Sequence, residues 1–191
     1  MLAVPPSRSR SSQRRPRSSP FRTPVRRESR YLQEVQLMVH SALLEAFDDV
    51  LRPLGFRKKS GSWYRISGDL YGLVGVQKSS WDESYYVNVG FAPAGKVKEG
   101  WLPESKCLVR FRVDAITSIS RKGLELLSVE GEEVARSDEL RSSLVEEIVV
   151  PVALLVDPIG SLGDLKSLLR SGVSGRVFIH HEIREKMFSG E

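Results

Sequence analysis

The chain has 191 residues and a formal net charge of +5, and this charge is unevenly distributed. Residues 1–30 hold nine arginines and one acid and carry +8, whereas the other 161 residues hold 20 basic and 23 acidic side chains and carry −3. The composition, with 40% hydrophobic residues, excludes collagen, a wholly disordered chain and a membrane bundle, and the single cysteine, Cys107, permits no internal disulfide and indicates a reducing compartment.

The sequence predicts a disordered tail over residues 1–29 and one domain over residues 30–191. Arginine, serine and proline fill 21 of the first 30 positions, and such a segment buries too little apolar surface to offset the entropy lost on ordering. Three interpretations stay open: residues 8–30 bind nucleic acid or another polyanion, the tail is a transit peptide, or it is a solvated extension or sequence upstream of the true start. Because no apolar run approaches 18 residues, we expect no membrane span and a cytoplasmic location.

The body opens with a predicted amphipathic helix from Tyr31 to Leu54. Its apolar residues recur at steps of three and four, which is the period of one helix face. The residue before a proline is pushed away from helical dihedral angles, so the helix should stop before Pro53.

Short β-type stretches follow, and the turns between the early ones are too short for parallel crossovers. We therefore expect an antiparallel meander of about 4–5 strands. In the fourth, apolar residues alternate with polar ones, so that Cys107, Val109, Phe111 and Val113 share one face. The expected strands are Ser62–Ser67, Leu70–Lys78, Tyr85–Phe91, Lys106–Val113 and Leu124–Val129.

Helical periodicity returns in the last third of the chain. We predict a helix over Glu139–Val150, a second one introduced by a capping box at Ser161 and running through Leu169, a short strand over Val177–Ile179, and a terminal helix over Glu182–Phe188. A helix, then strands, then helices is the order expected of an α+β domain.

Several local phrases occur in an order that resembles a known family. The leading helix closes on Leu51-Arg52-Pro53-Leu54-Gly55-Phe56-Arg57-Lys58-Lys59, and the strands contain Trp63-Tyr64-Arg65, Val76-Gln77-Lys78, Tyr86-Val87-Asn88-Val89-Gly90 and Val109-Arg110-Phe111-Arg112. Over roughly residues 33–170 the chain resembles the bacterial family called domain of unknown function 4304. The resemblance implies an α+β fold and no established activity or cofactor. Members often occur among genes that include toxin and immunity loci, which makes toxin neutralisation an expectation for some of them.

Polar strand residues form the main candidate binding patch, which consists of Gln77, Lys78, Asn88, Arg110 and Arg112. If alternation brings the amides and the guanidinium groups to one face, they suit anionic or amide-rich partners, because arginine presents a bidentate fork. The competing interpretation is the solvated face of a one-sided antiparallel sheet.

Aromatic residues in or beside the strands are candidate anchors for a protein partner. Tyrosine and tryptophan are common anchors of interfaces, but they also pack the cores of sheets and can stack on single-stranded bases. The candidates are Trp63, Trp81, Tyr85, Tyr86 and Trp101.

The inventory for catalysis is thin. The sequence contains no H-E-x-x-H, phosphate-binding loop, dinucleotide fingerprint or nucleophile elbow. His180 and His181 are adjacent, and adjacent strand residues point to opposite faces, so the pair should be a poor metal site. We predict no catalytic residue, no metal and no cofactor.

These observations favour a non-catalytic cytoplasmic domain that binds another protein, with toxin neutralisation as its most specific form. Two alternatives stay open. The protein binds nucleic acid through its basic tail, or it is a hydrolase whose site the sequence does not reveal.

Overall fold

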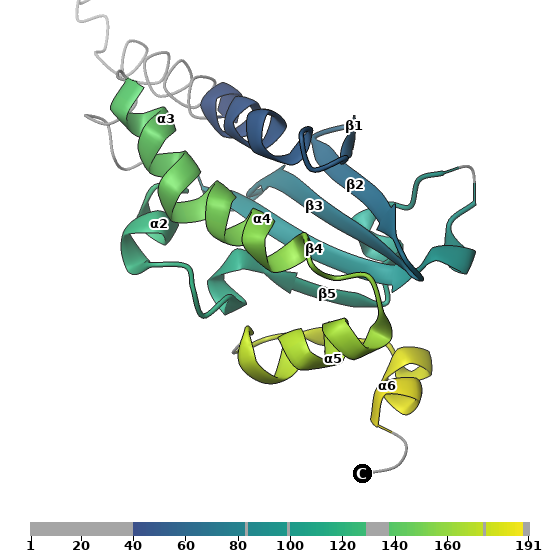
Figure 1. Cartoon of the computed structure of the whole chain (residues 1–191). Coiled ribbons are helices and arrows are strands. Elements are labelled where there is room, and N and C mark those ends of the chain that lie inside the picture. The colour runs from purple at the N-terminus through teal and green to yellow at the C-terminus, as the bar shows by residue number, and fades with distance from the viewer. Residues whose placement is uncertain (1–39, 83, 99, 129–137, 174, 189–191) are drawn as a thin grey trace, which may run out of the picture.

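A computed structural model of the chain describes residues 40–82, 84–98, 100–128, 138–173 and 175–188. It has a six-stranded sheet with helices layered against one of its faces (Figure 1). The predicted tail lies outside the described residues. Mixed helix and antiparallel sheet confirm the α+β class.

The sheet follows the chain from edge to edge, in the order β1 to β6, and each neighbouring pair is antiparallel. The meander is therefore confirmed, with six strands instead of four or five. Two short strands lie at the edges: β1, which was not predicted and consists of three exposed basic residues, and β6, which corresponds to the predicted short strand over Val177–Ile179. The strands are β1 (Arg57–Lys59), β2 (Ser62–Ser67), β3 (Leu70–Lys78), β4 (Tyr85–Pro93), β5 (Val109–Arg112) and β6 (Phe178–Ile179).

The described part of the leading helix covers residues 40–51 and ends ahead of Pro53, as the proline predicts. The predicted residues 31–39 lie outside the described chain. The helix buries Leu43, Phe47 and Leu51 completely against the sheet. At its end, Nη1 of Arg65 in β2 donates to the carbonyl of Leu54 at 2.6 Å.

The predicted strand over Lys106–Val113 shrinks to β5. A 3₁₀ turn, η2 (Glu104–Lys106), precedes it, and another, η3 (Val113–Ala115), follows. Alternation predicts that Cys107 shares a face with Val109 and Phe111. This prediction is wrong, because Cys107 lies before the strand begins. It packs instead with Tyr71, Leu73 and Ala92 in a small second cluster.

The predicted strand over Leu124–Val129 is wrong for its described part, because the chain forms the helix α2 (Arg121–Glu125). The hydroxyl of Ser120 caps this helix by accepting from the amide of Gly123 at 2.9 Å. The same hydroxyl donates to Glu147 at 2.6 Å, and Lys122 pairs with Glu147 at 3.1 Å. These contacts dock α2 on the next helix.

That next helix is longer than predicted. It begins as α3 (Asp138–Leu144), widens into a π-helical turn, η5 (Val145–Val149), and continues as α4 (Val150–Val156). Pro151 has no amide hydrogen, and its ring crowds the carbonyl four residues earlier, so the wider turn lets the helix pass the proline.

The C-terminal elements agree closely with expectation. The helix α5 (Leu162–Ser171) has the predicted capping box between Ser161 and Asp164. The helix α6 (His181–Phe188) closes the described chain. Within the described ranges, no helix combines the length and apolar character needed to cross a membrane.

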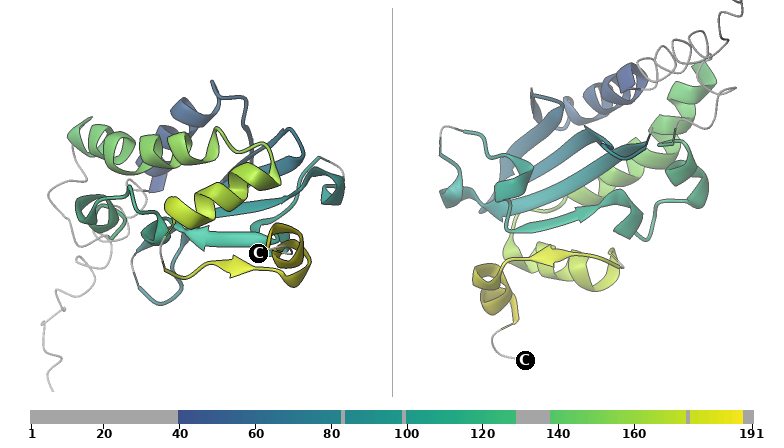
Figure 2. Two further views of the ribbon diagram at one scale, coloured as in Figure 1. Left: turned by 60° about the horizontal axis from the view of Figure 1, so that its bottom comes forward. Right: turned by 180° about the vertical axis from the view of Figure 1, so that it is seen from behind.

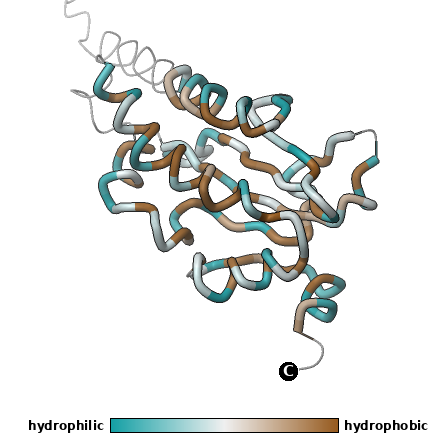
Figure 3. Tube along the Cα trace, in the orientation of Figure 1, coloured by the Kyte–Doolittle hydropathy of each residue, from teal (hydrophilic) through white to brown (hydrophobic). Residues whose placement is uncertain are grey.

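The main core lies between the helices and the sheet. Apolar residues follow the central strands and recur along each helix (Figure 3). The largest fully buried side chains include Trp63, Phe47, Phe91 and Leu144. Seen from behind, the opposite face of the sheet carries no helical layer over its central strands in the described part of the chain (Figure 2).

We expect Gly123→Ala to destabilise the protein. A Cβ atom there would lie 2.8 Å from the carbonyl oxygen of Glu147, so α2 would have to shift. Overpacking of this kind costs about 1–3 kcal/mol, which outweighs the helix propensity of alanine, worth about 1 kcal/mol. Urea denaturation measures the change. Gly95→Ala is the matched control, because its Cβ atom would meet nothing within 4 Å. A Gly123→Ala variant as stable as the control would contradict this packing.

We also expect the thiol of Cys107 to be unreactive in the native protein. It is 2% exposed, and burial raises its pKa to about 12, so the nucleophilic thiolate is scarce at neutral pH. Labelling with an aromatic disulfide reagent should be slow in buffer and fast in denaturant. Cys107→Ser supplies the blank, and fast labelling of the folded protein would disprove the burial.

Candidate binding site on the open sheet face

The open face is the side of the sheet turned away from the helices. The register places Gly75 opposite Asn88 and Asn88 opposite Arg112, while Gln77 lies opposite Tyr86. Residues that are directly opposite in an antiparallel pair share a face.

Arg110 pairs with Gly90, two residues from Asn88, and so lies on this face as well. Gln77, Asn88, Arg110 and Arg112 therefore meet on one face, where alternation predicted that they could.

Lys78 does not join this group. It pairs with Tyr85, which is 3% exposed and belongs to the main core on the helix side. Burial, followed by the nearby charge of Lys78, lowers the pKa of His40 in the leading helix. The structure thus places Lys78 on the covered face and separates it from the predicted patch.

Part of the open face is covered by the chain between β4 and β5. Tyr71 donates its hydroxyl to the carbonyl of Leu102 at 2.8 Å, and Cys107 packs against Gly90. A Cβ atom on Gly90 would lie 2.8 Å from the sulfur of Cys107, so the glycine permits this close approach. The covering segment leaves the sheet uncovered around Gln77, Asn88 and Arg112.

A hollow of about 710 Å³ occupies this uncovered part. Its floor consists of the polar strand residues Gln77, Asn88, Arg110 and Arg112. Its walls come from the turns before and after β5 and from the neighbouring edge strand β6 with the residues just before it. The wall residues include Glu104, Asp114, Arg176 and Phe178. Three of the charged side chains are arginines and two are acids, so the lining is slightly basic within a domain that is slightly acidic.

Stacking holds both floor arginines in place. The guanidinium of Arg112 lies 3.9 Å from the ring centre of Tyr86, and that of Arg110 lies 4.2 Å from the ring centre of Phe178. Arg110 also pairs with Glu104 at 3.6 Å. Such contacts restrict the rotamers of two long side chains before any ligand arrives.

The amide groups are positioned in the same way. Asn88 donates from Nδ2 to Oε1 of Gln77 at 3.2 Å, so the second amide hydrogen of Asn88 and both of Gln77 can serve a ligand. The buried Nε of Arg110 has no hydrogen-bond partner among the described residues. The hollow therefore presents forked donors suited to carboxylate, phosphate or backbone carbonyl oxygens.

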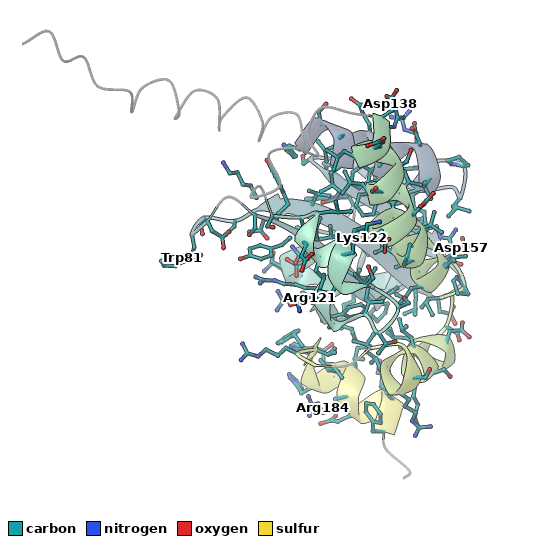
Figure 4. All side chains as sticks on the ribbon, turned by 90° about the vertical axis from the view of Figure 1, so that its left-hand side faces the viewer. Trp81, Arg121, Lys122, Asp138, Asp157 and Arg184 are labelled. Carbon is teal, nitrogen blue, oxygen red and sulfur yellow. The ribbon has the colours of Figure 1, made fainter. Side chains whose placement is uncertain are left out.

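The hairpin between β3 and β4 extends the same end of the sheet. Trp81 at its tip is 93% exposed, and Figure 4 shows its side chain projecting away from the body of the molecule. The buried hydroxyl of Ser79 accepts from the amides of Trp81 at 3.2 Å and Asp82 at 3.3 Å. Hydrogen bonds from Ser84 and Ser79 lower the pKa of Asp82, which keeps this carboxylate ionised as a brace of the turn.

The other predicted aromatic anchors divide into two groups. Trp63 is completely buried and donates from Nε1 to Asp48 at 2.9 Å, and Tyr85 is 3% exposed. Both are core residues, so predicting them as anchors was wrong. Tyr86 stacks with the guanidinium of Arg112. Trp101 is half-buried and contacts Lys59, whose Nζ lies 4.4 Å from the centre of the tryptophan ring.

The two adjacent histidines also differ from expectation. His180 follows the last residue of β6, and His181 is the first residue of α6. The chain turns between them, so their rings do not point to opposite faces but lie together, with centroids 4.2 Å apart and a tilt of 34° between the ring planes. Strand alternation does not apply at this junction.

Four wall residues escaped the sequence-based prediction: Glu104, Asp114, Arg176 and Phe178. Arg176 and Phe178 reach the hollow because β6 pairs with β5, with Phe178 opposite Arg110. The signal for β6 is two residues long and its partner is far away in the sequence, so no local pattern links them.

Comparison with known proteins gives a family but no curated relative. The model of the family described as "Domain of unknown function (DUF4304)" matches residues 47–153. The match includes the floor of the hollow and ends before Arg176 and Phe178. A search of the curated proteins and a search of the solved structures each found no match. Since the family model covers more than half of the 191 residues, and the resemblance of the strand phrases is thereby confirmed, the chain belongs to the DUF4304 family.

Proposed function

We propose that this domain is a non-catalytic binding protein, and that its partner is another protein that presents acidic side chains to the open sheet face. The observation that carries the proposal is the hollow in which Arg110 and Arg112 are stacked on aromatic rings and aimed away from the helices. A site built this way binds by complementarity and needs no reactive group.

The energetics support a protein partner. Arginine, tyrosine and tryptophan dominate the binding energy of protein interfaces, and the open face combines all three in Arg112, Tyr86 and Trp81. Because stacking already restricts Arg112 and Tyr86, and hydrogen bonds to Ser79 fix the backbone at Trp81, less conformational entropy is lost when a partner docks. The fully exposed Trp81 then supplies apolar burial next to the charged contacts.

The charge pattern favours acidic protein over nucleic acid at this site. A guanidinium group already occupies one face of each of the rings of Tyr86 and Phe178, so a base would have to compete with it for that face. Glu104 and Asp114 in the walls would repel a phosphate backbone. Separate carboxylates on a folded partner can avoid these two acids.

The most specific form of this proposal is toxin neutralisation. The toxin would be held stoichiometrically, with its active surface covered by the open face. This form rests on the resemblance to a family whose members often occur beside toxin genes, and the hollow supports only its binding step.

Substitutions in the hollow test the proposal. A partner is first captured with the full-length chain and identified, and its dissociation constant is then measured by calorimetry. We expect Arg110→Gln, Arg112→Gln and Trp81→Ala each to weaken binding by at least about tenfold, which corresponds to about 1.4 kcal/mol. Each variant removes the charge or the ring of one side chain and leaves the backbone hydrogen bonds of the strands in place.

Arg52→Gln is the matched control, because its side chain is 63% exposed and lies at the end of the leading helix, on the other side of the sheet. This variant should bind within about twofold of the original chain. If all four variants bind equally well, the partner does not use the open face and the proposal fails.

The basic tail supports a second candidate function, binding of nucleic acid by residues 8–30. A charge of +8 within 30 residues attracts a polyanion by releasing its counterions. On this hypothesis, deletion of residues 1–30 abolishes binding to RNA or DNA, and the intact chain shows a steep loss of affinity with salt. Equal retention of both forms on a polyanion column would eliminate it.

A further inference from the structure

A separate cluster of donor groups lies at the junction of β6 and α6, beyond the segment that matches the family. His180, His181 and Glu182 each place one possible ligand atom within 4.8 Å of the other two. We propose that these three side chains form a binding site for a divalent transition metal ion, and that zinc fits it best.

The donor set selects the class of metal. Two imidazole nitrogens and one carboxylate oxygen suit zinc, copper or nickel, whereas calcium and magnesium prefer oxygen ligands alone. Three protein ligands leave a fourth tetrahedral position for water or for a group from a partner. The site is therefore open on its solvent side.

The backbone of the junction is already fixed in the conformation that the site needs. The amide of His180 donates to the carbonyl of Leu108 at 2.7 Å, and the carbonyl of His180 accepts from Arg184 at 3.0 Å. Ile183 and Met187 are buried and hold α6 against the domain. Only side-chain rotation remains to be supplied on binding.

The distances are close to those that a metal requires. Zinc bonds to nitrogen and oxygen are about 2.0–2.2 Å long, so two ligands of a tetrahedral ion lie about 3.3 Å apart. The imidazole rings are 4.2 Å apart between centroids and inclined by 34°. Small changes in the side-chain torsions bring the ligand atoms from within 4.8 Å to this spacing.

One ring nitrogen of His180 is already placed as an acceptor. Nδ1 of His180 accepts a hydrogen bond from the amide of Glu182 at 3.4 Å, which makes Nδ1 the unprotonated nitrogen of that ring. This bond is long and weak, so a metal bond can replace it at little cost. Nε2 then carries the hydrogen.

Lys96 competes for the carboxylate. Its Nζ lies 2.9 Å from Oε2 of Glu182, and the ammonium group repels a cation at the same position. The partial positive charge at the start of α6 acts in the same direction. Removing the charge of Lys96 should therefore strengthen metal binding, a gain that an accidental pair of histidines would not show.

The test uses the full chain without a histidine tag and titrates it with Zn²⁺ in a calorimeter. We expect one-to-one binding that a chelator reverses. His180→Ala, His181→Ala and Glu182→Gln should each weaken it by at least about tenfold, the size of effect that even outer-sphere partners of a metal produce. Lys96→Gln should bind more tightly than the original chain.

His40→Gln is the matched control, because His40 is the third histidine of the chain and lies away from the cluster. It belongs to the leading helix and stacks on Tyr85 of β4, with 5.2 Å between the ring centres. The variant should bind zinc as the original chain does. Zinc should also raise the melting temperature of the original chain and leave that of a double His180→Ala, His181→Ala variant unchanged.

The absence of one-to-one binding would overturn the proposal. So would equal affinity in the His180→Ala and His181→Ala variants, or an affinity that Glu182→Gln and Lys96→Gln both leave unchanged. Circular dichroism of each metal-free variant establishes that it is folded, so that lost binding reports on the ligands.

Discussion

Among the described residues, α-helices pack against one face of the sheet and not the other, and the arrangement of the remaining segments follows from this asymmetry. Side chains alternate along each strand, so Trp63 and Val89 enter the main core while Tyr64 and Asn88 point the other way. An antiparallel sheet tolerates a solvated face because its strands need no helical crossovers. The segment between β4 and β5 covers part of the face that the helices leave open. The hollow exists where this second cover stops.

The face on which a residue lies could be predicted from the sequence, but what surrounds that face could not. Alternation within a strand is local, and it placed Gln77 and Asn88 correctly without knowledge of the sheet order. Lys78 is also part of the predicted patch, but the same alternation turns it to the other side of the sheet. Arg176 and Phe178 depend on the pairing of β6 with β5, a contact between distant parts of the chain that no short pattern encodes.

Errors of element type came from tertiary contacts that override local preference. The apolar residues after Gly123 suggested a strand, yet a capped helical turn forms because Ser120 and Lys122 can both reach Glu147. Likewise, the rule that adjacent side chains diverge holds only while the chain stays extended. This rule fails between His180 and His181, where the chain turns into α6, and the two histidine rings come together. The boundaries between elements thus decide which side chains meet. These boundaries depend on contacts between distant residues and cannot be predicted from a short stretch of sequence.

The position of β6 in the chain also determines when the hollow is complete. The floor of the hollow is built from residues that emerge early, and those strands can pair with their neighbours in sequence as the chain is synthesised. Phe178, which holds Arg110, belongs to β6 and is synthesised after the other five strands of the sheet. Until then Arg110 has no ring to lie on and the hollow has no far wall. A chain in which β6 has not yet paired with β5 would therefore lack both the ring over Arg110 and the wall that β6 gives to the hollow.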